Sequence, residues 1–407
     1  MNNPTATRTA GLSQLTHSLP LTGSIYTQWR NTDFGPQGDN QVSKLSPWLR
    51  HRLLLEPEVI EAAINAHGLD NAEKFVQEVC WRSYWKGFLE RRPVHWHDYV
   101  AERHAQRAHY ERFRDLSQQL ERAELGQTGI ACFDAWVHEL TTYGYLHNHA
   151  RMWFASIWVF TLGLPWALGA DFFLRHLLDG DPASNTLSWR WIAGYHTPGK
   201  TYLARASNIE RYTQQRFSPG ETLATEAPAP EGVERPPLGP APLPVNWQCS
   251  ANTGLLITEE DLMPESLFGQ PAWASTIAVQ ATQCRSDAPV NTQVSAFAHA
   301  GLVDALTRNQ SSKNIAPMAI DTAQGQTHAL EAMRQTGVTH WLTPWVPTGP
   351  TADAINALSK ALAAVDIQLE SVPRAWDVEV WPHATHGFFR FWKAVGPMLS
   401  QRYAAEE

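Results

Sequence analysis

Apolar residues recur at the three- and four-residue spacing of amphipathic helices almost without interruption from residue 21 to residue 218. No run in this range convincingly alternates apolar and polar residues, as a half-buried strand would. The pattern predicts an all-α domain at 21–218. The first 20 residues lack a comparable pattern and are expected to form a loose N-terminal arm.

The pattern changes after residue 246. Short apolar runs rich in β-branched residues alternate with helical patterns at 292–308, 323–336 and 350–364, and an amphipathic helix is expected at 387–402. This alternation is typical of a parallel sheet covered by helices, so 247–407 is predicted to be a smaller α/β domain of Rossmann or flavodoxin type. The predicted strands are Gly254–Thr258, Thr276–Ala281, Ile315–Ile320, Thr339–Thr343 and Ile367–Val372.

Residues 219–246 separate the two patterns. Eight of them are proline, which indicates an extended, semi-rigid linker without a core of its own. A further segment, Met152–Ala170, carries no charge and has the length of a membrane span. Because Gly163-Leu164-Pro165 interrupts it, we expect two buried helices instead.

Charge and cysteine content narrow the classes of function. The net charge of −8 opposes a general affinity for nucleic acid, although a local basic cleft remains compatible with it. The four cysteines show no CxxC spacing, which fits a reducing cytoplasm and argues against an iron–sulfur site. His147 and His149 point apart on a helix, so no metal site is predicted.

Polar and aromatic residues gather at four places in the helical range. Ser46-Pro47 has the form of a helix start, and the free N–H groups there, with Ser43 and Ser46, would suit a diphosphate. Ser-Pro also begins many helices that bind nothing.

Further on, an acid, an arginine and two indoles share one helix face, either as a ligand wall or as a satisfied Glu–Arg pair beneath aromatic rings. These four residues are Glu78, Trp81, Arg82 and Trp85.

The other two groups lie near residues 148 and 181. Asn148, Arg151 and Met152 share a helix face. Asp181-Pro182 begins a further helix, with Asn185 one turn later and Asp179 just outside. No loop of alternating oxygen ligands accompanies these acids, so calcium is not expected.

In this order the four groups resemble the FAD domain of the photolyase/cryptochrome family, over about 190 residues. The most specific part is Leu-Asp-Gly-Asp-Pro-Ala-Ser-Asn at 178–185, followed by Trp189 and Trp191. The resemblance implies a U-shaped FAD in a helical pocket, with Asn185 at flavin N5. The residues that it assigns to FAD are Tyr26, Ser43, Leu45, Ser46, Glu78, Arg82, Asn148, Arg151, Asp179, Asp181 and Asn185.

The resemblance also implies electron transfer and a lesion pocket. Trp189 and Trp166 match the first two members of the family's tryptophan chain, whereas the third position, near Tyr110–Phe113, has no Trp; Tyr110 or Trp96 would have to replace it. Catalytic roles fall to Glu78, Asn148, Asn185, Trp189 and Trp166. The positions matching DNA-lesion contacts are Arg30, Trp81, Met152 and Trp191.

Several positions depart from the family pattern. Val42 replaces a phosphate-loop Thr, Tyr145 replaces a Trp, and His149 replaces an Arg that lies near DNA in repair enzymes.

The C-terminal range faintly resembles the antenna domain that precedes the FAD domain in the family, which suggests a swapped domain order. An unrelated α/β domain is the alternative. No glycine-rich phosphate loop is present there, so no antenna cofactor is predicted.

Three functions follow from the resemblance. The first is light-driven electron transfer from reduced FAD to a pyrimidine dimer in damaged DNA, which would be the activity of a deoxyribodipyrimidine photo-lyase. The second is a cryptochrome-like blue-light photoreceptor that acts through a signalling partner. The third is a flavoprotein without light chemistry, against which the presence of both Trp189 and Trp166 counts.

Overall fold

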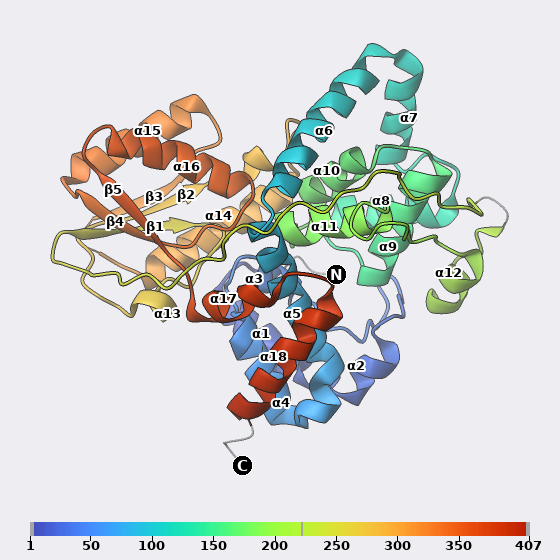
Figure 1. Ribbon diagram of the computed structural model, residues 1–407, viewed down its shortest axis with the longest axis horizontal. Helices are drawn as coiled ribbons and strands as arrows, with labels where there is room; N and C mark the ends of the chain where they lie inside the picture. The colour runs from blue at the N-terminus through green and yellow to red at the C-terminus, as the bar shows by residue number, and fades with distance from the viewer. Residues whose placement is uncertain (1–3, 221–222, 312, 404–407) are drawn as a thin grey trace. The chain divides into compact units, whose positions relative to one another are not determined.

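The structure is a computed structural model that describes residues 4–220, 223–311 and 313–403 (Figure 1). Its contacts define two compact units. The helical unit comprises Ser24–Val42 and Arg92–Leu238, and the sheet unit comprises Pro4–Gly23, Ser43–Arg91 and 239–403. These units follow the contacts and not the order of the chain, so the predicted domain boundaries at 20, 218 and 246 stay predictions.

The helical unit confirms the helical pattern of the sequence, with no strand among its described residues. Helices α6, α10 and α11 pack against one another around buried aromatic rings, among them Trp158, Phe173 and Trp189. The helices are α2 (Ser24–Trp29), α6 (Val94–Arg112), α7 (Arg114–Glu124), α8 (Ala131–Tyr143), α9 (Asn148–Ser156), α10 (Trp166–His176), α11 (Pro182–Ile192) and α12 (Ala206–Tyr212).

The uncharged segment at 152–170 forms two helices, as predicted. α9 runs into a π-helical turn at Ile157–Thr161, and α10 begins only at Trp166. Gly163 between them has a φ of +65°, a conformation that glycine adopts without the steric cost of a Cβ atom. Within the described residues, no helix combines the length and the apolar content needed to cross a membrane.

The sheet unit contains a five-stranded parallel sheet in the order β3-β2-β1-β4-β5, which confirms the predicted fold class. Each observed strand lies within one residue of the predicted one. The strands are β1 (Thr253–Thr258), β2 (Thr276–Gln280), β3 (Asn314–Ala319), β4 (His340–Pro344) and β5 (Gln368–Val372).

Helices cover both faces of the sheet (Figure 1). On one face, α15 (Ala323–Thr336) and α16 (Pro350–Ala363) bury a core that includes Leu256, Val279 and Trp341. α14 (Thr292–Arg308) packs against β1, β2 and β3 and takes no part in that core, so it covers the opposite face. Because side chains alternate along each strand, the continuous apolar runs in the sequence are explained by burial on both faces.

The remaining helices of the sheet unit come from both ends of the chain. α5 packs against α4, α17 and α18, so N-terminal and C-terminal segments share one core. These helices are α1 (Arg8–Ser18), α3 (Ser46–Arg50), α4 (Glu56–His67), α5 (Leu69–Glu90), α13 (Glu265–Phe268), α17 (Ala375–Val380) and α18 (Phe388–Tyr403).

The prediction of a loose N-terminal arm at 1–20 needs correction, since α1 lies within it. Thr7 caps this helix by accepting a hydrogen bond from Ala10 N–H at 3.1 Å. Arg8 forms an ion pair with Glu58 of α4, and Trp48 donates to the Thr5 carbonyl oxygen at 3.0 Å. These tertiary contacts, and not an amphipathic face, hold α1 in place. The apolar pattern of its sequence is weak, so the helix was not predicted.

A buried network of ion pairs joins α3 to the turn after β1. We call it the arginine–carboxylate network. Arg50 binds Glu260 in a bidentate pair at 2.6 and 2.7 Å, and Arg374 binds Asp261 in the same way at 2.6 and 2.7 Å. Arg52 adds a bond of 2.7 Å to Asp377 of α17. All six side chains are almost fully buried, so each charge depends on its partner for solvation.

Removing one member of this network should be costly. We expect Asp261→Ala to lower the free energy of unfolding by about 3–5 kcal/mol, because Arg374 and Arg52 would keep buried charges without this partner. Urea unfolding followed by circular dichroism measures the change. The control is Glu379→Ala, which breaks the exposed Arg402–Glu379 pair and should cost about 0–1 kcal/mol. Equal losses in the two variants would show that the network contributes no more than a surface pair.

Candidate functional site

The segment 178–185 has a compact local structure in the helical unit. Asp181 is the N-cap of α11 and accepts a hydrogen bond from Ser184 N–H at 2.9 Å, and Pro182 opens the helix. One turn on, the Asn185 amide donates to the Ala170 carbonyl oxygen of α10 at 2.9 Å. This bond fixes the side chain so that Asn185 Oδ1, which has no partner among the described residues, remains able to accept a hydrogen bond.

Asp179 is buried, and only one of its two carboxylate oxygens has a hydrogen-bond partner among the described residues. Its Oδ2 accepts a hydrogen bond from Arg151 at 2.8 Å, whereas its Oδ1 has no partner in the described part of the chain. Arg151 is held in turn by a bond of 3.0 Å to the Leu146 carbonyl oxygen. Burial by itself lowers the pKa of Arg151, but the Asp179 carboxylate outweighs it and the pKa is raised. A buried, unpaired carboxylate oxygen is costly unless a donor reaches it, so Oδ1 fits an N–H or O–H group of a ligand.

Of the other predicted residues in the helical unit, Asn148 is exposed at the first position of α9, and Met152 lies partly exposed one turn later. Tyr26 lies on α2, and Arg30 follows that helix. Trp191 stacks on Tyr202 with ring centroids 5.7 Å apart. The structure thus fixes Arg151, Asp179, Asp181 and Asn185 through named contacts.

The two predicted electron carriers have different surroundings. Trp189 is buried among Phe154, Trp158 and Phe173, and its ring lies against Gly169 so closely that a Cβ there would be 2.4 Å from it. Gly169 is one turn after Trp166 on α10. Trp166 is also buried, but its ring contacts the tyrosines Tyr99 and Tyr195.

The predicted phosphate-binding segment lies in the sheet unit. Leu45, and not Ser46, is the N-cap of α3, and Ser46 is the first helical residue. Leu45 is buried, whereas Ser43 and Ser46 are partly exposed and their hydroxyl groups have no partner among the described residues. Since α3 has only five residues, its dipole is small, and the two hydroxyls are the stronger reason to expect an anion here.

The polar and aromatic face of α5 has defined partners. Arg82 donates to Glu56 at 3.0 Å and to the Arg50 carbonyl oxygen at 3.1 Å, which ties it to the arginine–carboxylate network. Trp81 stacks face to face on Phe388 of α18, with centroids 3.9 Å apart and ring planes 9° from parallel. Glu78 lies on the same helix, in its third turn. The stacking position that the resemblance assigns to a DNA lesion is therefore occupied by a ring of the chain itself.

Sequence reasoning missed both Glu56 and Phe388. Glu56 could have been noticed as an acid before Pro57 at a helix start, but nothing in the sequence pairs it with Arg82. Phe388 belongs to the aromatic run 388–392, which was read only as the apolar face of a helix. Its contact with Trp81 joins residues about 300 positions apart and has no local signal.

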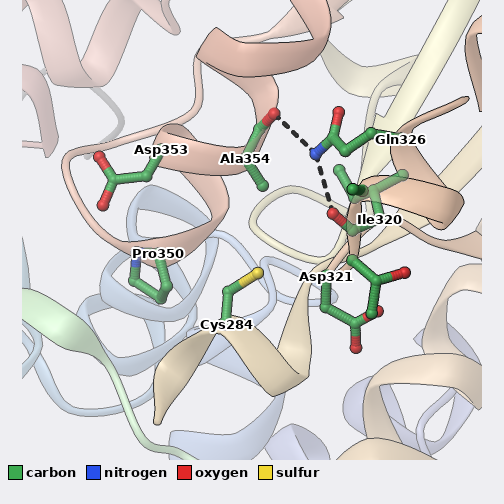
Figure 2. A pocket seen from close by; sticks show the side chains of 9 residues that line it. Cys284, Ile320, Asp321, Gln326, Pro350, Asp353 and Ala354 are labelled. Carbon is green, nitrogen blue, oxygen red and sulfur yellow. Dashed lines mark hydrogen bonds between the residues drawn. The ribbon is translucent and has the colours of Figure 1, made fainter. Parts of the chain in front are cut away.

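A cavity of about 290 Å³ opens where β2 and β3 end (Figure 2). Gln326 donates to the carbonyl oxygens of Ile320 and Ala354 and so joins α15 to α16. Burial, together with the carboxylates of Asp321, Glu259 and Asp353, raises the pKa of the Cys284 thiol to about 11. Parallel sheets commonly bind ligands at this edge, but two lining carboxylates make the cavity unfavourable for a phosphate.

Residues 75–221 match the family described as FAD binding domain of DNA photolyase. These residues therefore form an FAD-binding domain of the photolyase/cryptochrome type, as the sequence predicted. The matched range runs from α5 through all later helices of the helical unit.

Two curated relatives illustrate the extent of the similarity. The chain is 34% identical over 184 residues to the deoxyribodipyrimidine photo-lyase of Streptomyces griseus, covering 42% of this chain and 38% of that protein. It is 29% identical over 208 residues to a cryptochrome DASH of Natronomonas pharaonis, covering 47% and 40%. The chain thus spans about two fifths of the length of these relatives.

Among solved structures, the chain is similar to a bacterial class III photolyase from Agrobacterium tumefaciens. The two share 24% sequence identity with a TM-score of 0.43, over 51% of this chain and 43% of the other. At that TM-score the likeness carries no conclusion about this chain.

His147 makes the stability of α9 depend on pH. It is the N-cap of α9, and its Nδ1 accepts the His149 N–H at 3.2 Å. Burial, assisted by His149 and Arg151 and opposed by Asp33, lowers its pKa to about 4. In the unfolded chain its pKa is about 6.5. The unfolded state therefore binds the proton first, and stability falls as the pH decreases from the unfolded pKa to the folded one.

We expect His147→Asn to weaken this dependence by up to about 1.4 kcal/mol per pH unit in that window, because Asn keeps an N-cap acceptor but does not titrate. Urea unfolding at a series of pH values between 7 and 4 gives the measurement. His138→Asn, at an exposed position on α8, is the control and should leave the profile unchanged. An unchanged profile in His147→Asn would exclude this role for His147.

Proposed function

We propose that this protein is a blue-light-active FAD flavoprotein of the DNA photolyase type, which drives electron transfer from reduced FAD to a pyrimidine dimer in DNA. The observation that carries the proposal is the pair of open acceptors, Asp179 Oδ1 and Asn185 Oδ1, within the FAD-binding domain. Asp179 is buried with one oxygen unsatisfied, and Asn185 is held by Ala170 with its oxygen free. Together they suit a ligand that presents several N–H and O–H donors.

The residues present fit the chemistry of FAD. In the helical unit, Asp179 and Asp181 would accept hydrogen bonds from the flavin ring and ribityl hydroxyls, Arg151 and Asn148 would face the flavin, and Tyr26 would support the phosphates. In the sheet unit, the hydroxyls of Ser43 and Ser46, beside Leu45, would donate to phosphate oxygens, and Glu78 and Arg82 would line the flavin side. When bound, FAD supplies one-electron chemistry driven by light.

Asn185 has a specific part in this scheme. Its amide nitrogen donates one hydrogen bond to the Ala170 carbonyl oxygen, which fixes the side chain and leaves its oxygen able to accept from the ligand. An oxygen acceptor at flavin N5 favours the forms of the cofactor that carry a proton there, which are the reduced forms. Trp189 and Trp166 would return electrons to the site, since both are buried and the Trp189 ring lies against Gly169, one helical turn after Trp166 on α10.

For repair, damaged DNA would have to present a flipped-out lesion to the protein. Trp81 and Trp191 would hold it by stacking, Met152 would line the pocket, Glu78 would bond its edge, and Arg30 would contact the DNA backbone. Trp81 is stacked on Phe388 in this structure, so a lesion would have to displace that ring.

The same contact favours a second candidate function, a cryptochrome-like photoreceptor without repair activity. The indole that would stack on a lesion, Trp81, is covered by the C-terminal helix of the protein itself, and the net charge is −8. Both features oppose the binding of damaged DNA. In that case a signalling partner would read the redox state of the flavin.

The sheet unit supports the proposal of a swapped domain order. Its parallel sheet follows the FAD-binding domain in the chain, whereas the family's antenna domain precedes it. We propose no antenna cofactor, because the cavity at the sheet edge carries Asp321 and Asp353 and no glycine-rich loop. The four cysteines are free thiols, which agrees with a reducing cytoplasm.

One experiment tests the proposal and separates the candidates. The purified protein is loaded with FAD, illuminated with blue light in the presence of a reductant, and mixed with dimer-containing DNA, with a dark sample as control. Loss of dimers only in the light supports repair, and photoreduction without loss of dimers supports the photoreceptor. A protein that neither carries nor takes up FAD contradicts both.

Asp179→Asn should weaken FAD binding. The change removes the charge that a ligand donor would meet and weakens the bond to Arg151, and a hydrogen bond to a charged group is worth about 1.5–3 kcal/mol. The dissociation constant should therefore rise roughly 10- to 150-fold. Flavin fluorescence titration measures it, and Asp115→Asn, an exposed acid on α7, serves as the control of equal charge. Equal affinities in both variants would remove Asp179 from the site.

A further inference from the structure

Two tyrosine rings contact Trp166, and they differ in their exposure to solvent. Tyr99 and Tyr195 both contact its ring, with centroids 5.8 and 5.9 Å away and ring planes tilted by 42° and 41°. Tyr99 is fully buried on α6 and leads to Trp96, which is buried as well, at 5.3 Å. Tyr195 follows α11 and is partly exposed. Of the two tyrosines against Trp166, Tyr99 is fully buried and Tyr195 itself reaches solvent.

Neither residue at the expected third position takes part. The Tyr110 ring contacts His109 at 6.1 Å and makes no ring contact with Trp166 within the described residues. Phe113 is 53% exposed, the one ring contact it makes within the described residues is with His109, and a phenyl ring without an ionisable group is a poor electron donor. The end of the electron path has to be sought elsewhere.

Arg190 lies beside both rings, whose centroids are 5.9 Å apart. Its guanidinium carbon is 5.6 Å from the ring centroid of Trp166 and 5.6 Å from that of Tyr195. A tryptophan radical cation beside a fixed, buried positive charge is destabilised by Coulomb repulsion. A tyrosine that loses its proton on oxidation becomes a neutral radical and escapes that repulsion. Arg190 therefore opposes a radical cation on Trp166. The nearby Glu102 and Asp98 carboxylates offset part of its charge, so loss of the phenolic proton is what favours Tyr195 as the final oxidised site.

We propose that Tyr195 is the outer electron donor of the Trp189–Trp166 path and replaces a third tryptophan. This inference rests on the proposed light-driven function. An electron that leaves Trp189 for the photoexcited flavin is replaced from Trp166. Tyr195 then gives one electron to the Trp166 radical cation and its phenolic proton to water, which leaves Trp166 restored and Tyr195 as a neutral tyrosyl radical. An added thiol reductant returns one electron and a proton to it.

The protonation of the phenol agrees with this step. Burial raises the pKa of Tyr195, the Glu102 carboxylate raises it further, and Arg190 opposes both. The phenol thus carries its proton before oxidation, and its partial exposure gives that proton a path to solvent.

The test is electron paramagnetic resonance of the FAD-loaded full-length protein, frozen during blue illumination. The wild type should give a tyrosyl radical signal, which Tyr195→Phe should lose. Tyr99→Phe is the matched control, since it removes the hydroxyl of the other tyrosine against Trp166, and it should keep the signal. Trp166→Phe should lose it too, because the path runs through that ring. Equal flavin content and circular dichroism spectra in all variants establish that they are folded.

Two contrary outcomes are distinguishable. If the wild type is photoreduced but Tyr195→Phe keeps its tyrosyl signal, or Tyr99→Phe loses it, the assignment of Tyr195 is wrong while the proposed function stands. If the loaded wild type shows neither photoreduction nor any radical, the proposed function fails and the Tyr195 assignment fails with it.

Discussion

The sheet unit depends on the arginine–carboxylate network beneath its first strand. Arg50 is the last residue of α3 and Arg52 follows two positions later, and their partners Glu260 and Asp261 come about 210 residues later, in the turn after β1. Buried charges of this kind stabilise only in the presence of each partner, so they commit the α3 segment to one position against the sheet. Because Arg82 on α5 joins the same network through Glu56, two of the segments predicted to bind FAD are positioned by an ionic core that belongs to the α/β part of the chain.

The helical unit is stabilised mainly by the packing of aromatic side chains. Its interior consists largely of aromatic rings, and the close approach of Trp189 to Gly169 shows how little space the packing leaves. Within that interior, Asp179 keeps one carboxylate oxygen and Asn185 its amide oxygen without a partner among the described residues, and both lie at the start of α11. A folded chain tolerates an unsatisfied buried acceptor where a bound ligand normally donates a hydrogen bond to it. FAD, the ligand indicated by the family match at 75–221, carries such donors.

The secondary structure could be predicted closely from the sequence, since the strands and long helices of the second half are set by apolar periodicity and by turn residues. The pair Asp181-Pro182 also predicted the start of α11 correctly, because helix capping is a local interaction. Local rules failed at α1 and at α3. α1 is held by Arg8 and Trp48 through contacts with distant residues, and at α3 the cap position fell to Leu45 instead of Ser46.

By itself, the sequence determined the fold classes and the presence of an FAD-binding domain, because periodicity and short motifs record local geometry. Only the tertiary structure decided which groups are free to act. It showed that Arg82 is bound to Glu56, that Phe388 covers Trp81, that Asp179 keeps an open oxygen, and that Trp166 has Tyr195 as its exposed neighbour. These facts join residues far apart in the chain, and such pairings arise from packing and charge compensation, for which no local pattern exists.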